Sequence, residues 1–280
     1  MRSRGTGSGT RLSRWAITLV LACVSVSTIY PMVFLVSTAL KGRREYLTNR
    51  YGLPLQPTLE NLQHAWTYGR VGEYALNSVV VVVAAVAVSC IVCALAGYAL
   101  AHLRFPGRRA AFLGLLGSMI VAPQLIIIPL HGQLLRMDLL NRPIGLILVY
   151  VTLATPFGVY LLTSYFRSIP VELVEAAQMD GAGHLQVLLR VIAPVGRPAI
   201  VTLAIFNFLW MWNELLFALL ILQDDSVRTL MTGLAVQRGQ YTANVPLIAA
   251  GLLLAATPVL AVFFAFQGQI ARGMTMGAVK

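Results

Sequence analysis

The chain has 280 residues, and its composition is that of a protein that lies in a lipid bilayer. Charged residues make up 11% of it, against roughly 25% in an ordinary globular protein. Hydrophobic residues make up 58%, and mean hydropathy is +0.77. The charges fall in short groups between long apolar stretches, which are each long enough to cross about 30 Å of hydrocarbon. The composition therefore excludes a soluble enzyme.

The chain carries a formal net charge of +11, from 21 Lys and Arg against 10 Asp and Glu. In a soluble protein this excess would suggest nucleic-acid binding. Here most of the basic residues flank apolar stretches, where Lys and Arg contact lipid headgroups and set the orientation of the spans. We therefore expect membrane lipid as a partner and no nucleic acid.

The three cysteines, Cys23, Cys90 and Cys93, all lie inside apolar stretches. Cys90 and Cys93 form a CxxC pair that would share one helix face, but no ligand histidine or second pair stands nearby. We expect them to be small buried hydrophobic residues, and we predict no metal site, no cofactor and no catalytic residue.

Six stretches of the chain are apolar enough to span a membrane with some tilt. No stretch alternates with a period of two, as an outer-membrane barrel would require. The backbone groups must therefore be satisfied inside helices. We predict an all-α polytopic membrane protein with six transmembrane helices, at residues 15–40, 77–103, 110–135, 144–166, 199–222 and 246–266.

The first span begins after a basic tail at residues 1–14. Its apolar run is too long for the core of a cleaved signal peptide, and five more spans follow, so we expect a retained helix. The arginines of the tail predict a cytoplasmic N-terminus, and six crossings then place both termini inside. Lys41, Arg43 and Arg44 oppose this orientation, because they would follow the first span on the outer side.

Residues 167–198 are helical in pattern but too polar to enter lipid. Pro170 suits a first helical turn, and Glu172 and Glu175 lie where they favour the helix dipole. Gly181 and Gly183 then interrupt the pattern.

A second amphipathic helix follows these glycines. Asp180 is placed to cap it, and Pro194 to end it. The polar face of the first helix is acidic, whereas a helix lying on lipid carries Lys and Arg there. The segment is therefore predicted to be two short helices that meet at a glycine corner and dock into a groove on another protein.

The same segment resembles the EAA loop of bacterial ABC importer permeases. The matching residues are Glu175, Ala176 and Ala177, then Gly181, then Ile192 and Pro194; Ala193 departs from the usual Leu. Residues 96–109, 207–220 and 271–280 also resemble the carbohydrate-type permeases, in particular the second permease subunit of the maltose importer. His102 stands where that family often has Arg.

The resemblance covers almost the whole chain and implies a MetI-like permease bundle in a bacterial inner membrane. Two permease subunits would form the pathway, here as a heterodimer, with two cytoplasmic ATP-binding subunits and an extracytoplasmic solute-binding protein. The EAA loop would couple ATP hydrolysis to alternating access through Glu175, Ala176, Ala177, Asp180, Gly181, Ile192 and Pro194. The substrate would be a sugar or polyol whose identity the sequence does not specify.

The energy source follows from what the chain lacks. A phosphate-binding loop requires a Lys in a Gly-rich context, and neither Lys41 nor Lys280 has one. Energy must come from a partner or an ion gradient. The gradient alternative is a secondary transporter using Glu214, the one acid inside a predicted span, although no second acid or base accompanies it there. A purely structural scaffold is a third possibility.

Five residues are candidates for lining the substrate pathway, because aromatic faces with amides and acids recognise sugars: Asn207, Trp210, Asn213, Glu214 and Gln124. Trp210 and Trp212 lie too deep for an interfacial belt, so pathway and helix-packing roles both remain open. Gln124, between Pro123 and Pro129, marks a break in the third span that would either free carbonyls toward a cavity or form a plain kink.

Two further segments lie outside the predicted spans. Residues 41–76 form the longest external segment, where Thr58 can cap a short amphipathic helix that lies on the membrane or meets the binding protein. Residues 267–280 form a cytoplasmic tail that would approach the ATP-binding subunits or fray.

Overall fold

The computed structural model describes residues 9–240 and 244–276, which contain helices and turns and no strand. The chain divides into two compact units. The first comprises Met1–Arg70 and Gln237–Leu254, and the second comprises Val71–Val236 and Ala255–Lys280. Residues 1–8 of the predicted N-terminal tail and 277–280 of the predicted C-terminal tail lie outside the described residues.

The first unit begins with α1 (Gly9–Ala39), which carries the first predicted span and starts within the predicted tail. Two short helices follow, α2 (Arg43–Thr48) and α3 (Glu60–Thr67). The hydroxyl of Thr58 accepts a hydrogen bond from the backbone N–H of Glu60 at 3.2 Å. Thr58 therefore satisfies one of the free donors at the start of α3, as the sequence predicts.

The segment between α1 and α3 is folded around the side chain of Lys41, which is fully buried. Its ammonium group donates hydrogen bonds to the carbonyls of Asn49, Arg50 and Gly52, at 2.7, 3.3 and 2.6 Å. The Ser37 hydroxyl also donates to the Gly52 carbonyl, at 3.0 Å. Lys41 is therefore an internal structural cation rather than a charge presented to headgroups. Lys41 therefore does not count among the flanking charges whose distribution sets the orientation of the chain in the membrane.

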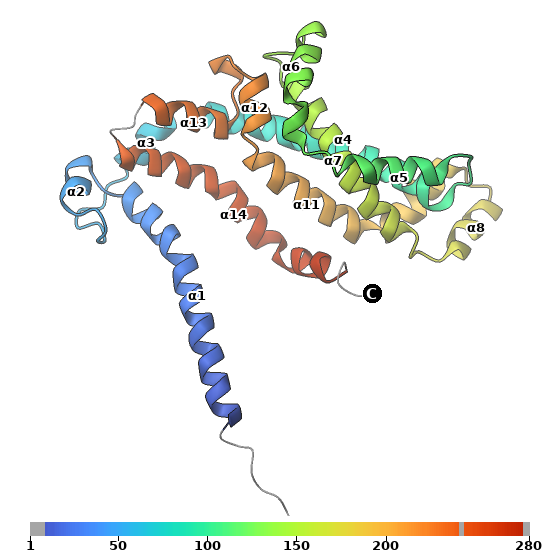
Figure 1. The fold of residues 1–280 in the computed structure, drawn as a ribbon, viewed down its shortest axis with the longest axis horizontal. Coiled ribbons are helices and arrows are strands. Elements are labelled where there is room, and N and C mark those ends of the chain that lie inside the picture. The colour runs from blue at the N-terminus through green and yellow to red at the C-terminus, as the bar shows by residue number, and fades with distance from the viewer. Residues whose placement is uncertain (1–8, 241–243, 277–280) are drawn as a thin grey trace, which may run out of the picture. The chain divides into compact units, whose positions relative to one another are not determined.

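The second unit is built on three long helices that pack against one another (Figure 1): α4 (Val71–His102), α7 (Pro143–Phe166) and α11 (Arg197–Asn213). Small residues allow their close approach. A Cβ at Gly158 of α7 would lie 2.5 Å from the sulfur of Cys93 on α4, and one at Gly97 would lie 3.0 Å from the Cβ of Leu162. Close packing through small residues is how helices associate in lipid.

The third predicted span is not one straight helix. It consists of α5 (Arg108–Ser118), η1 (Pro123–Ile126) and α6 (Ile127–Arg136), with a bend of 90° between its two halves. The helix ends before Pro123, because proline has no N–H to continue the helical bonds and disfavours a helical residue before it. The break predicted around Gln124 is therefore present, and it begins a few residues earlier.

The fifth predicted span is also interrupted, contrary to the single helix expected over 199–222. Helix α11 ends at Asn213, Glu214 is extended, and a separate helix α12 (Leu216–Ile221) follows. Beyond it the chain forms η3 (Asp225–Val227), α13 (Leu230–Gln240) and α14 (Val245–Met276). The last helix continues through the first ten residues of the predicted C-terminal tail.

In the part of the chain that the structure describes, four helices are individually long and apolar enough to cross a membrane: Ile17–Ala39, Val71–His102, Pro143–Phe166 and Val245–Gly268. Two bent pairs, Arg108–Ser118 with Pro123–Arg136 and His184–Val195 with Arg197–Asn213, raise the number to six if each pair is one span. The fold is thus a polytopic helical membrane bundle.

Replacing Lys41 with Met tests its structural role. The variant roughly keeps the length of the side chain but removes the hydrogen bonds from a charged donor, which costs about 1.5–3 kcal/mol. We expect chymotryptic cleavage after the exposed Tyr51 to rise at least about tenfold, because proteolysis follows the population of the open loop. Arg43→Met, an exposed position next to the same loop, is the control. Equal cleavage rates in the two variants would contradict the structural role.

Candidate functional site

A polar segment of short helices connects the two apolar helices α7 and α11. It contains α8 (Val171–Met179), α9 (His184–Val187), the π-helical turn η2 (Leu188–Ile192) and α10 (Ala193–Val195). We call residues 171–195 the coupling segment, after the role that the resemblance to the EAA loop implies. Its two short helices meet at a glycine corner, as predicted.

Helix α8 has one face packed into the protein and one face exposed. Val174 is buried and Ala177, one turn later, is partly buried against the same core. Glu175, Ala176 and Met179 are exposed, and the Met179 side chain retains 88% of its accessible surface. The outward face therefore combines an apolar side chain with acidic groups, which is suited to a groove on another protein.

The corner itself depends on Gly181, whose φ is +83°. A residue with a Cβ is strained in this left-handed conformation. Gly183, two residues later, has an ordinary φ of −70° and starts α9. Open space surrounds the Cβ position of both glycines. The two therefore differ in backbone conformation and not in crowding.

Of the two local predictions for the ends of the second helix, one is wrong. Asp180 does not cap α9; it lies at the C-terminal end of α8 and makes no capping bond through its side chain. The side chain of Gln186 instead accepts the Gly183 N–H at 3.1 Å. The second helix ends as predicted: it stops at Val195, one residue after Pro194, and the chain bends by 80° before α11 begins.

The inner face of the coupling segment forms part of the hydrophobic core of the second unit. Val174, Val187, Leu188 and Ile192 pack in one cluster with Phe166 of α7 and with residues of α4 and α11. At Gly196, between α10 and α11, a Cβ would lie 2.6 Å from the Phe166 ring. A displacement of the segment must therefore move these helices, since close-packed interiors do not deform continuously.

The ends of α4 and α7 next to the coupling segment are also bonded to each other. A ring nitrogen of His102 lies 3.1 Å from the Phe166 carbonyl oxygen. The guanidinium group of Arg167 donates to the carbonyl of Leu100 at 3.3 Å and lies 5.0 Å from the centre of the Phe112 ring. These contacts hold together the ends of α4 and α7 that lie next to the coupling segment.

Two of the polar or aromatic residues singled out in α11 serve helix packing. Asn207 is buried, and its amide donates to the hydroxyl of Ser89 on α4 at 2.9 Å. Trp212 is buried, and its indole N–H donates to the carbonyl of Ala255 at 3.1 Å. These contacts favour the packing alternative that the sequence left open.

Trp210 and Asn213 lie on the exposed side of the same helix. Trp210 makes an edge-to-face contact with Tyr150 of α7, with ring centres 5.6 Å apart. Phe206, one turn earlier and also exposed, makes a similar contact with Phe157 at 6.3 Å. An aromatic face thus runs along α7 and α11 toward the amide of Asn213.

Glu214 organises the break after α11. Its carboxylate accepts hydrogen bonds from the backbone N–H groups of Phe217 and Ala218, at 2.9 and 3.1 Å, and from the Tyr150 hydroxyl at 3.0 Å. A negative charge at a helix N-terminus is also favoured by the helix dipole. The acid in the apolar stretch is therefore a side-chain cap for α12, an assignment that the sequence analysis missed.

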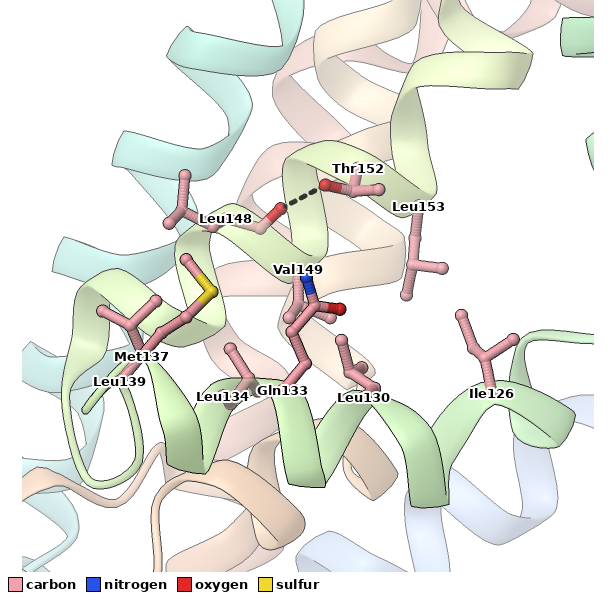
Figure 2. A pocket seen from close by; sticks show the side chains of 10 residues that line it. All are labelled: Ile126, Leu130, Gln133, Leu134, Met137, Leu139, Leu148, Val149, Thr152 and Leu153. Atoms are coloured by element: carbon pink, nitrogen blue, oxygen red, sulfur yellow. Dashed lines mark hydrogen bonds between the residues drawn. The ribbon is translucent and has the colours of Figure 1, made fainter.

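Gln124 is exposed in η1 and does not line either cavity of the second unit described here. Figure 2 shows the smaller cavity, of about 350 Å³, where side chains of η1 and α6 face those of α7. Gln133 is its main polar group, since the Thr152 hydroxyl donates to the Leu148 carbonyl. A neighbouring cavity of about 840 Å³ is lined mainly by apolar residues of α5, η1 and α7. Neither offers the polar groups that a sugar needs.

The cysteines differ in environment. Cys93 is fully buried, Cys90 is partly buried and Cys23 is exposed on α1. Within residues 9–240 and 244–276, no three His, Cys, Asp or Glu side chains lie close enough together to hold a metal ion.

Comparison with known proteins identifies the family. Residues 94–276 match the model of the binding-protein-dependent transport system inner membrane component. This range holds the coupling segment, α7, α11 and α12. The chain belongs to this family of ABC importer permeases, and it is not an enzyme.

Individual relatives cover most of the chain. The diacetylchitobiose uptake system permease protein NgcG of Streptomyces coelicolor is 36% identical over 258 residues, which is 91% of this chain and 85% of that protein. The melibiose/raffinose/stachyose import permease protein MelC of Bacillus subtilis is 31% identical, covering 94% and 96%. A bacterial ABC transporter involved in import of the polysaccharide alginate has a chain with a TM-score of 0.84 at 21% identity, over 95% and 99%. This last likeness shows the fold.

A double-mutant cycle tests the packing role of Asn207. Ser89→Ala and Asn207→Ala should each lower the stability of the purified protein by about 0.6–1.7 kcal/mol. Their effects should not add, since either substitution breaks the same bond. Thermal unfolding in detergent measures this, and the KM for uptake should not change. Asn213→Ala, on the exposed side, is the control and should leave the melting temperature unchanged. A raised KM in Asn207→Ala at unchanged stability would instead assign Asn207 to the pathway.

Proposed function

We propose that this chain is one permease subunit of an ABC importer for a carbohydrate, a sugar or polyol. The observation that carries the proposal is the two-faced coupling segment. Its outer face is apolar and acidic, and its inner face belongs to the core of the bundle. The carbohydrate class is supported by the relatives, whose names include uptake of diacetylchitobiose, of melibiose, raffinose and stachyose, and of alpha-glucosides.

The family implies cytoplasmic ATP-binding subunits and a solute-binding protein as partners. We propose two ATP-binding subunits, a different permease as the second half of the pathway, and an inner-membrane location with both termini in the cytoplasm. The burial of Lys41 supports this orientation, because it leaves only Arg43 and Arg44 of the three opposing charges on the surface. The coupling segment then lies on the cytoplasmic side.

Transport would proceed by alternating access. Closure of the ATP-binding subunits pushes on the acidic outer face of α8, where Glu175, Ala176 and Met179 are exposed. The push passes through Ile192 and the turn at Pro194 into α11, since this part of the chain packs as one core. Domain movement around such packed elements is a common form of switching.

We also propose that the exposed side of α11 contributes to the substrate pathway. Trp210 offers a ring face and Asn213 an amide, the two kinds of group that a sugar requires. Glu214 acts there through the position of α12 rather than as a proton site, because its oxygens are occupied by three donors. Gln124 remains a candidate for the pathway at the bend of the third span.

Substitutions at the two glycines of the corner test the coupling role. Gly181→Leu places a side chain at φ +83° and should distort the corner at a cost of about 1–2 kcal/mol. We expect membrane insertion to persist while uptake falls at least about tenfold for the same rate of ATP hydrolysis. Gly183→Leu, with an ordinary φ and open space around it, is the matched control.

Reversing the charge on the outer face is a second, independent test of coupling. Glu175→Lys should weaken co-purification of the ATP-binding subunit. Reversing the sign of a charge at an interface brings like charges together and opposes docking. Glu175→Gln should have a smaller effect. Wild-type transport and co-purification in Glu175→Lys would exclude the coupling role of this face.

The energy source separates this proposal from an ion-coupled transporter. In proteoliposomes that contain the complete importer, uptake should require ATP inside and should persist when a protonophore removes the proton gradient. Glu214→Gln should not create or abolish proton dependence. Uptake driven by a gradient without ATP would establish the secondary transporter instead, and no solute-dependent flux would indicate a structural scaffold.

A further inference from the structure

The segment that follows α11 is held in place at three positions. We call residues 214–229 the strap; it contains α12 and η3 and leads into α13. Helix α12 packs against α6 and α7. The strap lies at the end of α11 opposite the coupling segment (Figure 1). The strap, α6, α7 and α11 all belong to the second unit.

The first attachment is at Glu214. Its carboxylate holds the start of α12 and accepts a hydrogen bond from the Tyr150 hydroxyl at 3.0 Å. Tyr150 is almost fully buried in α7 and also contacts the ring of Trp210. The hydroxyl of Tyr150 therefore ties the start of the strap to a different helix from the one that precedes it.

The second attachment is at Asn141, in the turn before α7. Its side-chain oxygen accepts the backbone N–H groups of Gln223 and Asp224, at 2.7 and 3.0 Å. Its own backbone N–H donates to the carbonyl of Ile221 at 2.8 Å. Asn141 has a φ of +57°, a conformation that Asn tolerates better than most residues. One residue thus holds the far end of α12 through three hydrogen bonds.

The third attachment joins the rest of the strap to the first turns of α4. The Tyr74 hydroxyl donates to the carboxylate of Asp225 at 2.7 Å. The Asn77 amide donates to the carbonyls of Ser226 and Arg228, at 3.0 and 3.1 Å. These bonds are directional, so the strap cannot slide along α4 and α7 as an apolar surface could.

Helix α11 connects this attached strap to the coupling segment. Its 17 residues span about 25 Å, and it follows the corner at Gly196 directly. A push on the coupling segment along α11 therefore arrives at Glu214. The strap must then either resist the push or detach from Tyr150 and Asn141. A small set of directional bonds that is either made or broken is a two-state element.

We propose that Tyr150 and Asn141 are positioning residues that latch the strap and close the pathway at the end opposite the ATP-binding subunits, and that movement of α11 releases it. The inference rests on the proposed function. In the transport cycle, the closed latch prevents ATP hydrolysis from proceeding without substrate. Release at Glu214 and Asn141 accompanies opening toward the side from which the solute arrives.

Substitution of Asn141 with Gly tests the latch cleanly. Glycine keeps the positive φ at no steric cost but removes the oxygen that binds Gln223 and Asp224. Asp138→Gly is the matched control: Asp138 lies in the same turn with a φ of +55°, and its ion pair with Arg142 is exposed. An exposed pair of this kind contributes little.

Tyr150→Phe provides a second variant at the other end of the strap. It removes one hydroxyl and keeps the ring that contacts Trp210. Tyr160→Phe, an exposed tyrosine of the same helix, is its control. Each variant is reconstituted in the complete importer, and ATP hydrolysis without solute, solute-driven uptake and the melting temperature are measured.

We expect Asn141→Gly and Tyr150→Phe to raise hydrolysis without solute by about threefold to tenfold, from the strength of such bonds in membrane proteins. The number of ATP molecules used per solute should rise by a similar factor. The two control variants should match the wild type in both measurements.

A lower melting temperature with an unchanged ratio of ATP to solute would overturn the proposal, because it would show a structural role alone. Identity with the controls in all measurements would overturn it too. Either result leaves the proposed function standing if the wild-type importer couples ATP to uptake. Uptake by the wild type without ATP-binding subunits would instead contradict the proposed function itself.

Discussion

The structure depends on one constraint: a backbone that leaves the helical pattern inside a bilayer must find hydrogen-bond partners within the protein. The chain breaks its helices at several points, and at both ends of α12 a side chain supplies the partner. Glu214 accepts the first donors of α12, and Asn141 binds the backbone at its end. At Pro194 a π-helical turn changes the spacing of the bonds instead of supplying a side chain.

The breaks divide the second unit into parts that can move. Helix α11 runs between two of them, the corner at Gly196 and the break at Glu214. At its first end the coupling segment is packed by apolar contacts, through Ile192 and Phe166. At its other end the strap is held by hydrogen bonds. Apolar packing transmits a push, whereas a few directional bonds can be broken and made again, so the two ends suit different tasks.

Much of this arrangement could be predicted from the sequence. The length of the apolar stretch predicts the bounds of α7 closely. The acidic helix and the two glycines predict the two short helices of the coupling segment and the corner between them. The break at Glu214 could not be predicted, because a lone acid in an apolar run has the same pattern whether it lines a pathway or caps a helix. The burial of Lys41 could not be predicted either. Its partners are backbone carbonyls, which every residue carries, so the sequence does not identify them. Likewise, Asn207 and Asn213 lie on the same helix, but Asn207 is buried and Asn213 is exposed, and only the packing of α4 distinguishes them.

The central claim is that the outer face of the coupling segment receives work from an ATP-binding subunit. Site-specific cross-linking at Met179, the most exposed of the large apolar residues of α8, tests it most directly. Cysteine would replace Met179 in a chain in which Cys23, Cys90 and Cys93 are replaced with Ser, and a bifunctional thiol reagent would be applied to the complete importer in membranes. The account predicts a cross-linked product with the ATP-binding subunit that depends on the cysteine at position 179. Cross-linking of this cysteine to an extracytoplasmic protein, with none to the ATP-binding subunit, would contradict it.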